Sequence, residues 1–310
     1  MAHKTRSRRS IKYSTRKLKD KEKYVICMPM GGLCDMMARI QACIEYCKKH
    51  KRILILDTSK STHAKDGIEK YFQIDSPVLF HGNLQKKYEA LKGRSFYPPE
   101  LAGTFLSMHV INSKRKGIHT RTDYIDKKTR LRTYFDTRQS YSEDVLLYRI
   151  HGGNLEEVVN FLSLCKLTPL VKQIYKKRRS MLPHEYISVH VRNTDYKSNV
   201  DEFLKIHSKI FKANTIFLAT DDYHTIQKFK DLHGTQVITF ADIKPLNGAI
   251  AHHKKTMTKK ENITMTIDAI VDLLLLAGGT TVYASSKESG YSKVAKLLHD
   301  NPKILTHLLE

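Results

Sequence analysis

The chain has 310 residues, 41% of them apolar, and five cysteines. This length allows two domains of ordinary size, and the apolar content excludes an intrinsically disordered chain. No apolar run approaches the roughly 20 residues of a membrane span. The basic stretch 1–23 lacks the apolar segment of a secretory signal. An odd number of cysteines without paired metal-ligand spacing favours reduced thiols, so we expect a cytoplasmic protein.

The formal net charge of +23 points to a polyanionic partner. Basic residues are concentrated in 1–23, which we expect to be disordered, and in 107–140. A basic surface suits an anionic diphosphate ligand, and the tail suits nucleic acid equally well. Charge therefore leaves both kinds of partner open.

The first half of the chain opens with the pattern of a strand, a helix and a second strand. Residues 24–29 are a β-type run, 36–50 carry apolar side chains at helical spacing, and 52–57 have the pattern of a fully buried strand. Three such elements in so short a stretch predict a βαβ unit with a parallel sheet.

The middle of the chain, residues 97–144, is rich in Arg, Lys, Thr and Tyr and has little periodicity. We predict long loops beside a cleft for it. A strand follows at 145–150 and a helix at 152–164. A second helix begins after Pro169, and 178–183 is the predicted crossover between two domains.

The second half repeats the α/β alternation, interrupted by a polar loop at 241–260. The pattern predicts an α/β, GT-B-like fold, with two Rossmann-like domains and a cleft between them. Ligands of such sheets bind beyond the carboxyl ends of the strands. We divide the chain into the tail 1–23, a first domain 24–180 on the acceptor side and a second domain 181–310 that binds the ligand. The predicted strands of the second half are 186–191, 215–219, 236–240 and 280–284, and its helices are 201–211, 223–232, 263–276 and 291–299.

Glycines mark the first turn between a strand and a helix. Gly31 and Gly32 let a backbone approach an anion, and the helix start that follows offers free N–H groups. Asp35 closes the turn. The turn has two interpretations, an anion site or a tight turn in which Asp35 caps the helix. It is not a dinucleotide-binding fingerprint.

The strand at 186–191 ends in alternating polar residues. His190 and Arg192 lie two residues apart and therefore share one face of the strand. A guanidinium binds phosphate through two parallel hydrogen bonds, and Asp195 is placed to orient it. The alternative is a salt bridge that closes the strand end.

Two acidic pairs follow in the second half. Asp221 and Asp222 come directly after a strand, where a helix cap is the default role and metal binding the less favoured alternative. Asp268 and Asp272 lie four residues apart on an otherwise apolar helix, where an unpaired carboxylate is costly to bury. This second pair either accepts hydrogen bonds from the two donors of a guanine edge or faces solvent.

Small hydroxyl residues and a glycine fill the turn between the last predicted strand and its helix. Ser289 and Gly290 stand at the helix start, which is an anion-binding position in many proteins. The alternative is ordinary capping by Ser289.

Taken in chain order, these motifs resemble the fucosyltransferase superfamily that includes core α1,6-fucosyltransferases, nodulation-factor fucosyltransferases and protein O-fucosyltransferases. The most specific match is the His-x-Arg-x-x-Asp motif. The resemblance runs from residue 24 to about residue 298, with a poor match in the middle. The matching segments are 32–35 (GLCD), 190–195 (HVRNTD), 217–222 (FLATDD), 272–277 (DLLLLA) and 289–295 (SGYSKVA).

The resemblance implies a GT-B fold, inversion at the anomeric carbon, no metal and no cofactor, with GDP-fucose as the donor and a glycan or glycoprotein hydroxyl as the acceptor. By analogy, Arg192 would hold the β-phosphate, and His190 and Asp272 would contact guanine. Ser289 and the Gly32 loop would line the diphosphate and sugar. Asn193 stands where core α1,6 enzymes have a second arginine, and Cys34 where the loop has a later glycine.

An inverting reaction also needs a carboxylate to take the acceptor proton. Asp201 and Glu202, shortly after the arginine motif, are the candidate bases. Their alternative is the ordinary placing of acids in the first turn of a helix. Three other functions stay open: a transferase that uses another nucleotide sugar such as UDP-xylose, a homologue that binds the nucleotide sugar without turnover, and a basic nucleic-acid-binding protein.

Overall fold

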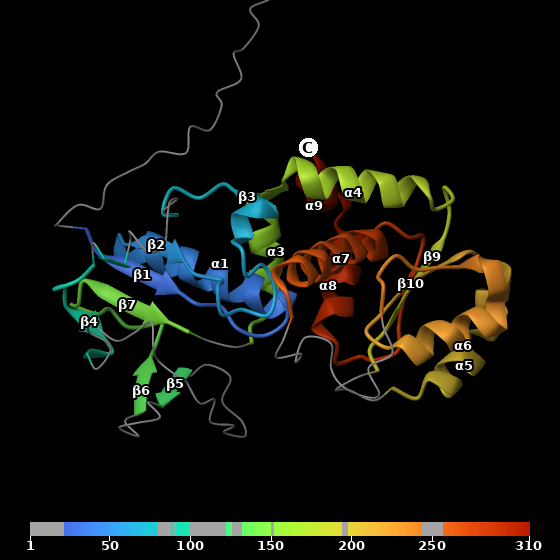
Figure 1. Ribbon diagram of the computed structural model, residues 1–310, viewed down its shortest axis with the longest axis horizontal. Coiled ribbons are helices and arrows are strands. Elements are labelled where there is room, and N and C mark those ends of the chain that lie inside the picture. The colour runs from blue at the N-terminus through green and yellow to red at the C-terminus, as the bar shows by residue number, and fades with distance from the viewer. Residues whose placement is uncertain are drawn as a thin grey trace, which may run out of the picture.

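The computed structural model describes residues 22–79, 88–89, 91–99, 122–125, 132–149, 152–193, 198–243 and 257–310. Two parallel sheets lie toward opposite ends of an elongated molecule, with several helices between them (Figure 1). Residues 1–21 of the basic tail, Asp195 and most of the basic segment 107–140 lie outside the described residues.

The first sheet has four parallel strands in the order β2-β1-β7-β4. These are β1 (Tyr24–Cys27), β2 (Ile53–Leu56), β4 (Phe96–Tyr97) and β7 (Val145–Tyr148). Every residue of β1 and β7 is buried, which explains why these strands are continuous apolar runs. The predicted strands at 24–29, 52–57 and 145–150 are confirmed, each with shorter bounds.

Helix α1 (Leu33–His50) follows β1 and begins earlier than the predicted residue 36. The reason lies in its first turn, where Gly32 is the N-cap and its backbone N–H donates to Asp35 Oδ2 over 3.0 Å. The helix ends at Lys51, whose left-handed backbone (φ 51°) closes it.

The middle of the chain contains an antiparallel pair of strands, β5 (Thr122–Ile125) and β6 (Arg132–Phe135). The prediction of loops throughout 97–144 is therefore wrong for these two segments. Polar and apolar residues are mixed in both, so neither has the apolar pattern by which the other strands were found.

A second small ladder lies between the two large sheets. Strands β3 (Phe72–Ile74) and β8 (Cys165–Leu167) pair antiparallel, and the short helix η1 (Ile68–Lys70) precedes β3. Helix α3 (Leu155–Ser163), predicted over 152–164, comes directly before β8, which was not predicted, and its cap Asn154 accepts the N–H of Glu157.

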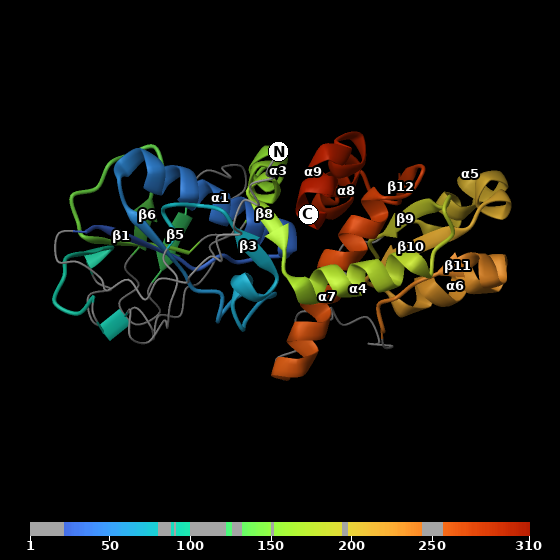
Figure 2. The same cartoon turned by 90° about the horizontal axis from the view of Figure 1, so that it is seen from above.

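Helix α4 (Pro169–Ser180) carries the chain from the first sheet to the second. The helix was predicted to follow Pro169, where proline suits the first helical position. The predicted crossover at 178–183 begins inside its last turn, because α4 runs to Ser180. Figure 2 shows α4 and α7 crossing in the space between the two sheets.

The second sheet also has four parallel strands, in the order β11-β10-β9-β12. Helices α5 and α6 lie toward the outer end of the molecule, and α7 and α8 lie on the side of the first sheet (Figure 1). All the predicted elements of this half are confirmed with shifted ends, and α9 is an addition. The strands are β9 (Ile187–Val191), β10 (Ile216–Thr220), β11 (Val237–Ile238) and β12 (Val282–Ala284), and the helices are α5 (Val200–Ala213), α6 (Tyr223–His233), α7 (Lys259–Ala277), α8 (Gly290–Asp300) and α9 (Pro302–Leu309).

One cluster of buried apolar side chains joins the two ends of the molecule. It includes Met36 of α1, Phe161 of α3, Ile270 of α7 and Val294 of α8, each at most 1% exposed. Helix α9 packs against β8 and α3 and buries Leu308, so the last helix returns to elements of the first half of the chain. The helices between the sheets therefore hold the carboxyl end of β9 in a fixed relation to the start of α1.

Candidate functional site

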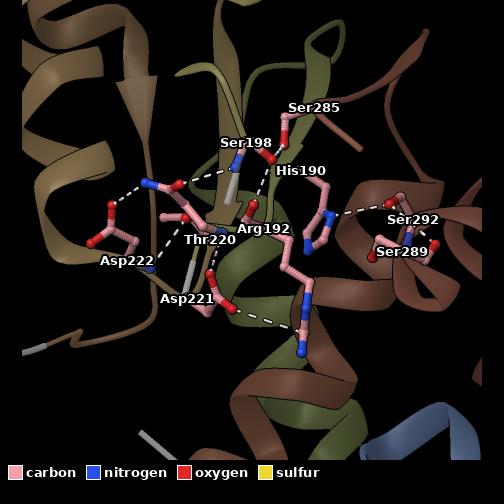
Figure 3. A network of polar contacts seen from close by, with 10 residues as sticks. His190, Arg192, Ser198, Thr220, Asp221, Asp222, Ser285, Ser289 and Ser292 are labelled. Carbon is pink, nitrogen blue, oxygen red and sulfur yellow. Dashed lines mark hydrogen bonds and ion pairs between the residues drawn. The ribbon is translucent and has the colours of Figure 1, made fainter. Parts of the chain in front are cut away.

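The carboxyl end of β9 carries the first part of the candidate site. The strand itself is buried throughout, and His190 and Arg192 leave it on the same face. Strand β10 pairs in parallel beside it, with Thr220 opposite Val191. This register brings Asp221, the first residue after β10, next to Arg192 (Figure 3).

Arg192 lies at the edge of the site with a quarter of its side chain exposed. Its Nη1 is 3.8 Å from Asp221 Oδ2, and the two side chains are 27% and 28% exposed. Asp221 Oδ1 also accepts the backbone N–H of Asn193 over 2.9 Å, and Ser198 donates its hydroxyl to the carbonyl of Arg192 over 2.6 Å. Asp221 is thus a described partner of the arginine. Asp195, which was predicted to orient it, lies outside the described residues.

Asp222 has the role of helix cap that its position predicts. Its carboxylate accepts the backbone N–H groups of His224 and Thr225, the Thr225 hydroxyl and the side-chain amide of Asn193. Burial alone would raise the pKa of this carboxyl, but the hydrogen bonds from Thr225 and Asn193 outweigh burial and hold the pKa below its usual value. Asp222 therefore fixes the start of α6 and the residue that follows Arg192.

His190 is buried, with 6% of its surface exposed. Its Nδ1 is 3.1 Å from the Ser292 hydroxyl, and its ring centroid is 5.1 Å from that of Tyr291, which donates its own hydroxyl to the carbonyl of Ala269. Burial and, less strongly, the charge of Arg192 lower the pKa of His190 to about 3. The imidazole is therefore neutral at physiological pH and has one donor and one acceptor nitrogen.

The turn after β12 starts helix α8 beside His190 (Figure 3). Ser289 is the N-cap, and its hydroxyl accepts the Ser292 N–H over 3.5 Å, so the capping interpretation is confirmed. Gly290 is the first helical residue. Ser289 is 7% exposed, which leaves little of it open to a ligand in this state.

The glycine turn before α1 is closed by its own acid. Gly31 has a φ of +96°, which few residues other than glycine adopt, and a Cβ built there would lie 2.5 Å from Asp35 Oδ2. Asp35 also accepts the N–H of Gly32, as a capping residue does. The Gly32 amide that was predicted to face an anion is thus bonded within the turn.

The start of α1 nonetheless faces the arginine of the second sheet. The pKa of the Cys34 thiol is raised to about 12, mainly by burial and also by the charge of Asp35. The charge of Arg192 lowers this pKa in part. Burial raises the pKa of Tyr291, and the charges of Asp272 and Cys34 add to this. Because the interaction between two charges weakens with distance, these effects require that the starts of α1 and α8 lie close to the end of β9. The structure therefore brings Cys34 at the start of α1 within electrostatic range of Arg192.

Asp268 and Asp272 share one guanidinium, that of Arg178 at the end of α4. Arg178 donates from Nη2 to Asp268 Oδ1, and its Nη1 is 3.5 Å from Asp272 Oδ1. Asp272 is 6% exposed, so the interpretation of a solvent-facing pair is wrong for it. Burial raises the pKa of Asp272 to about 8, while Arg178 lowers it and Asp268 raises it.

Asp201 and Glu202 take the role of helix-start acids. The side chain of Asp201 is 76% exposed and forms an ion pair with Lys228 of α6. Glu202 Oε2 accepts a hydrogen bond from the side chain of Asn199, the cap of α5. These contacts give both acids a structural function at the start of α5, and their role as general bases stays a prediction.

Sequence reasoning missed two residues of this region, Arg178 and Ser292. The only signal for Ser292 is its place three residues after Ser289, which puts it in the first turn of α8. Arg178 has no local signal, because it is one cation in a run of basic residues and its partners Asp268 and Asp272 are far away in the sequence.

Two further findings concern the described part of the chain. No group of three or more His, Cys, Asp or Glu side chains within it is arranged to hold a metal ion. Within the same residues, no helix has both the length and the apolar character that a membrane crossing requires.

No protein-family model and no curated protein sequence matches the chain. Its fold, in contrast, is similar to those of solved fucosyltransferases. The structure of NodZ α1,6-fucosyltransferase soaked with GDP-fucose matches with a TM-score of 0.62 at 18% identity, covering 90% of this chain and 93% of the other. Fucosyltransferase NodZ from Bradyrhizobium matches with a TM-score of 0.59, the same identity and the same coverage. POFUT1 in complex with GDP matches with a TM-score of 0.51 at 12% identity, covering 94% of this chain and 97% of the other. The chain therefore has the α/β, GT-B-like fold of these fucosyltransferases, as its motifs predicted.

Proposed function

We propose that this protein is a glycosyltransferase that takes fucose from GDP-fucose and transfers it to a hydroxyl of a glycan or glycoprotein. One solved structure of similar fold is that of NodZ soaked with GDP-fucose, and another is that of POFUT1 in complex with GDP. The motifs that the chain shares with fucosyltransferases come together in its fold, at the ends of β9 and β10 and at the starts of α1 and α8.

The observation that carries the proposal is the position of Arg192. Its guanidinium is partly exposed, stands at the carboxyl end of a parallel strand and acts electrostatically on the start of α1. Ligands of α/β sheets bind at this edge, and a guanidinium binds phosphate through two parallel hydrogen bonds. Arg192 would hold the β-phosphate and neutralise the charge that GDP gains as the sugar leaves. A well-placed donor of this kind stabilises a transition state by about 3–4 kcal/mol.

The nucleobase would lie beside His190 and Asp272. The neutral imidazole offers a hydrogen bond without the repulsion that a second cation next to Arg192 would cause. An ionised Asp272 accepts hydrogen bonds from the N–H groups on the guanine edge, which uracil lacks in that arrangement. These two residues would give the preference for GDP over UDP.

The transfer itself would invert the anomeric carbon. The acceptor oxygen forms the new bond to that carbon on the face opposite GDP, the bond to the phosphate oxygen breaks, and the acceptor proton passes to a base. In this proposal Arg192 supplies the positive charge on the diphosphate, with no metal required. Turnover that persists in excess EDTA, with product of the opposite anomeric configuration to the donor, is the expected result.

A panel of ligands tests the proposal. Thermal unfolding is followed with GDP, UDP, GDP-fucose and UDP-xylose, because a ligand at 100 times its dissociation constant adds about 2.7 kcal/mol of stability. We expect stabilisation by GDP and GDP-fucose and release of GDP from the donor in the presence of acceptor glycans. Stabilisation by UDP-xylose instead would identify another donor. GDP binding without turnover would identify a non-catalytic homologue. Salt-dependent binding of DNA or RNA without any nucleotide effect would favour the nucleic-acid-binding function.

A further inference from the structure

Arg178 connects the helix that links the two sheets to the helix that borders the candidate site. It stands in the last turn of α4 and reaches α7, where it contacts Asp268 and Asp272. Figure 2 shows these two helices crossing between the sheets. Only 17% of the Arg178 side chain is exposed. A largely buried cation thus stands between two acids, and a buried charge is costly unless it is paired.

The two acids are held differently. Asp268 accepts a hydrogen bond from Arg178 Nη2, and the Arg178 Cζ atom lies over the ring of Phe240, 5.5 Å from its centroid. Arg178 Nη1 and Asp272 Oδ1 are both buried and face each other at 3.5 Å, and neither makes a hydrogen bond. The arginine is therefore anchored by Asp268 and Phe240, and it supports Asp272 by charge alone.

Asp272 also lies within electrostatic range of Tyr291, which packs against His190. The ring of Tyr291 on α8 is 5.1 Å from that of His190, and the charges of Asp272, Cys34 and Asp268 all act on the Tyr291 hydroxyl. The charged groups that act on Asp272 are Arg178 from α4 and Asp268 from α7, and Asp272 in turn acts on Tyr291 from α8. Of these groups, only Arg178 favours the ionised form of the carboxyl.

We propose that Arg178 and Asp268 are positioning residues that set the charge of Asp272 and thereby the choice of nucleobase, an inference that rests on the proposed binding of GDP-fucose. An ionised Asp272 only accepts hydrogen bonds and so matches the N1–H and N2–H₂ donors of guanine. A protonated Asp272 offers one donor and one acceptor, and that pattern also fits adenine. Arg178 favours the first state through its positive charge. Asp268 opposes the ionised state of Asp272 because it repels a second negative charge and because it holds the Arg178 guanidinium in its own hydrogen bond.

The pH dependence follows from these charges. Because the pKa of Asp272 is raised to about 8, its ionised fraction grows as the pH rises toward that value. The affinity for GDP should rise over the same range. In Asp268→Asn, the repelling charge is gone and Arg178 is free to turn to Asp272, so the rise should occur at lower pH. In Arg178→Met, the positive charge that favours ionised Asp272 is gone, and the affinity for GDP should stay low over the whole pH range.

The experiment measures the affinities for GDP and ADP by calorimetry between about pH 6.0 and 8.5. The proteins are the wild type, R178M, D268N, D272N and the double variant R178M/D272N. The matched control is K176M, an exposed cation on the same helix. We expect R178M to lose about tenfold in GDP affinity near pH 8 and to lose its preference for GDP over ADP, while K176M behaves as the wild type. D272N should show no rise with pH, and adding R178M to it should cost no further affinity.

Two results would overturn the inference alone. One is a GDP affinity of R178M equal to that of K176M at every pH, and the other is an unchanged pH profile in D268N. The pH profile of D268N tests the inference even if R178M does not fold, because D268N leaves the Arg178 cation in place. Failure of the wild-type protein to bind GDP at any pH is a different outcome and would overturn the proposed function together with this inference.

Discussion

Arg192 and Asp221 face each other from the ends of two neighbouring parallel strands, with Nη1 of the arginine 3.8 Å from Oδ2 of the acid. The pairing of β9 with β10 places them there, because Thr220 lies opposite Val191. Both side chains are about a quarter exposed. The ion pair is thus loose and open, which suits an arginine that must turn part of its guanidinium to a ligand.

Asp221 should therefore affect the reaction more than the binding of the nucleotide. In Asp221→Asn, Arg192 loses the charge that orients it, and we expect kcat to fall about tenfold. The affinity for GDP should change little, because the lost orientation and the removed negative charge act in opposite directions. Steady-state kinetics and calorimetry measure the two quantities separately. A large loss of affinity with an unchanged kcat would contradict this account.

Asp222 should act mainly on stability. Asp222→Ala removes the cap of α6 and four hydrogen bonds to its carboxylate. Loss of a helix cap typically costs about 1–2 kcal/mol of unfolding free energy. Urea unfolding followed by circular dichroism measures the change. Unaltered stability would show that water or a neighbouring group replaces the carboxylate.

The turn before α1 requires glycine at position 31. Gly31→Ala would place a side chain in a left-handed backbone region and against the Asp35 carboxylate. We expect a loss of about 1–2 kcal/mol in stability from the backbone alone. Gly234→Ala is a useful comparison, since Gly234 also has a positive φ but its Cβ would meet nothing within 4 Å. A greater loss in Gly31→Ala than in Gly234→Ala is the predicted result, and equal losses would argue against the clash with Asp35.

His190 should make the protein sensitive to acid. Its pKa is about 3 in the folded chain, below the ordinary value of 6.5, so the unfolded chain binds the proton first as the pH falls. The stability that neutral His190 contributes is complete above about pH 6.5 and is lost toward pH 3, at up to about 1.4 kcal/mol per pH unit. His190→Gln should flatten this part of the pH profile of urea unfolding. Identical slopes in the wild type and the variant would contradict the burial of the histidine.

The sequence predicted most of the elements because buried parallel strands and their helices have clear apolar patterns. The starts of helices were predicted less exactly. Helix α1 begins next to the hydrogen bond between Gly32 and Asp35, and not where the apolar spacing begins. Strands β5 and β6 were missed because they lack such a pattern.

The site was predicted less completely than the fold. His190 and Arg192 share a strand, so their common face follows from local geometry alone. The pairing of Arg192 with Asp221 depends on the register between two strands, and the pairing of Arg178 with Asp272 depends on how two helices cross. Neither relation is encoded in a local pattern. Hydroxyl and acidic residues at helix starts suit both ligand binding and capping, and the structure gives Ser289, Asp222 and Glu202 capping contacts.

The most direct test of the account compares GDP with GMP. The central claim is that Arg192 binds the β-phosphate, which GMP lacks. Calorimetry with the wild type and Arg192→Ala gives four affinities, and their ratio isolates the contribution of that phosphate. We predict that the wild type binds GDP at least about tenfold more tightly than GMP, and that in Arg192→Ala this preference disappears while the affinity for GMP is retained. The same preference for GDP in both proteins would contradict the account.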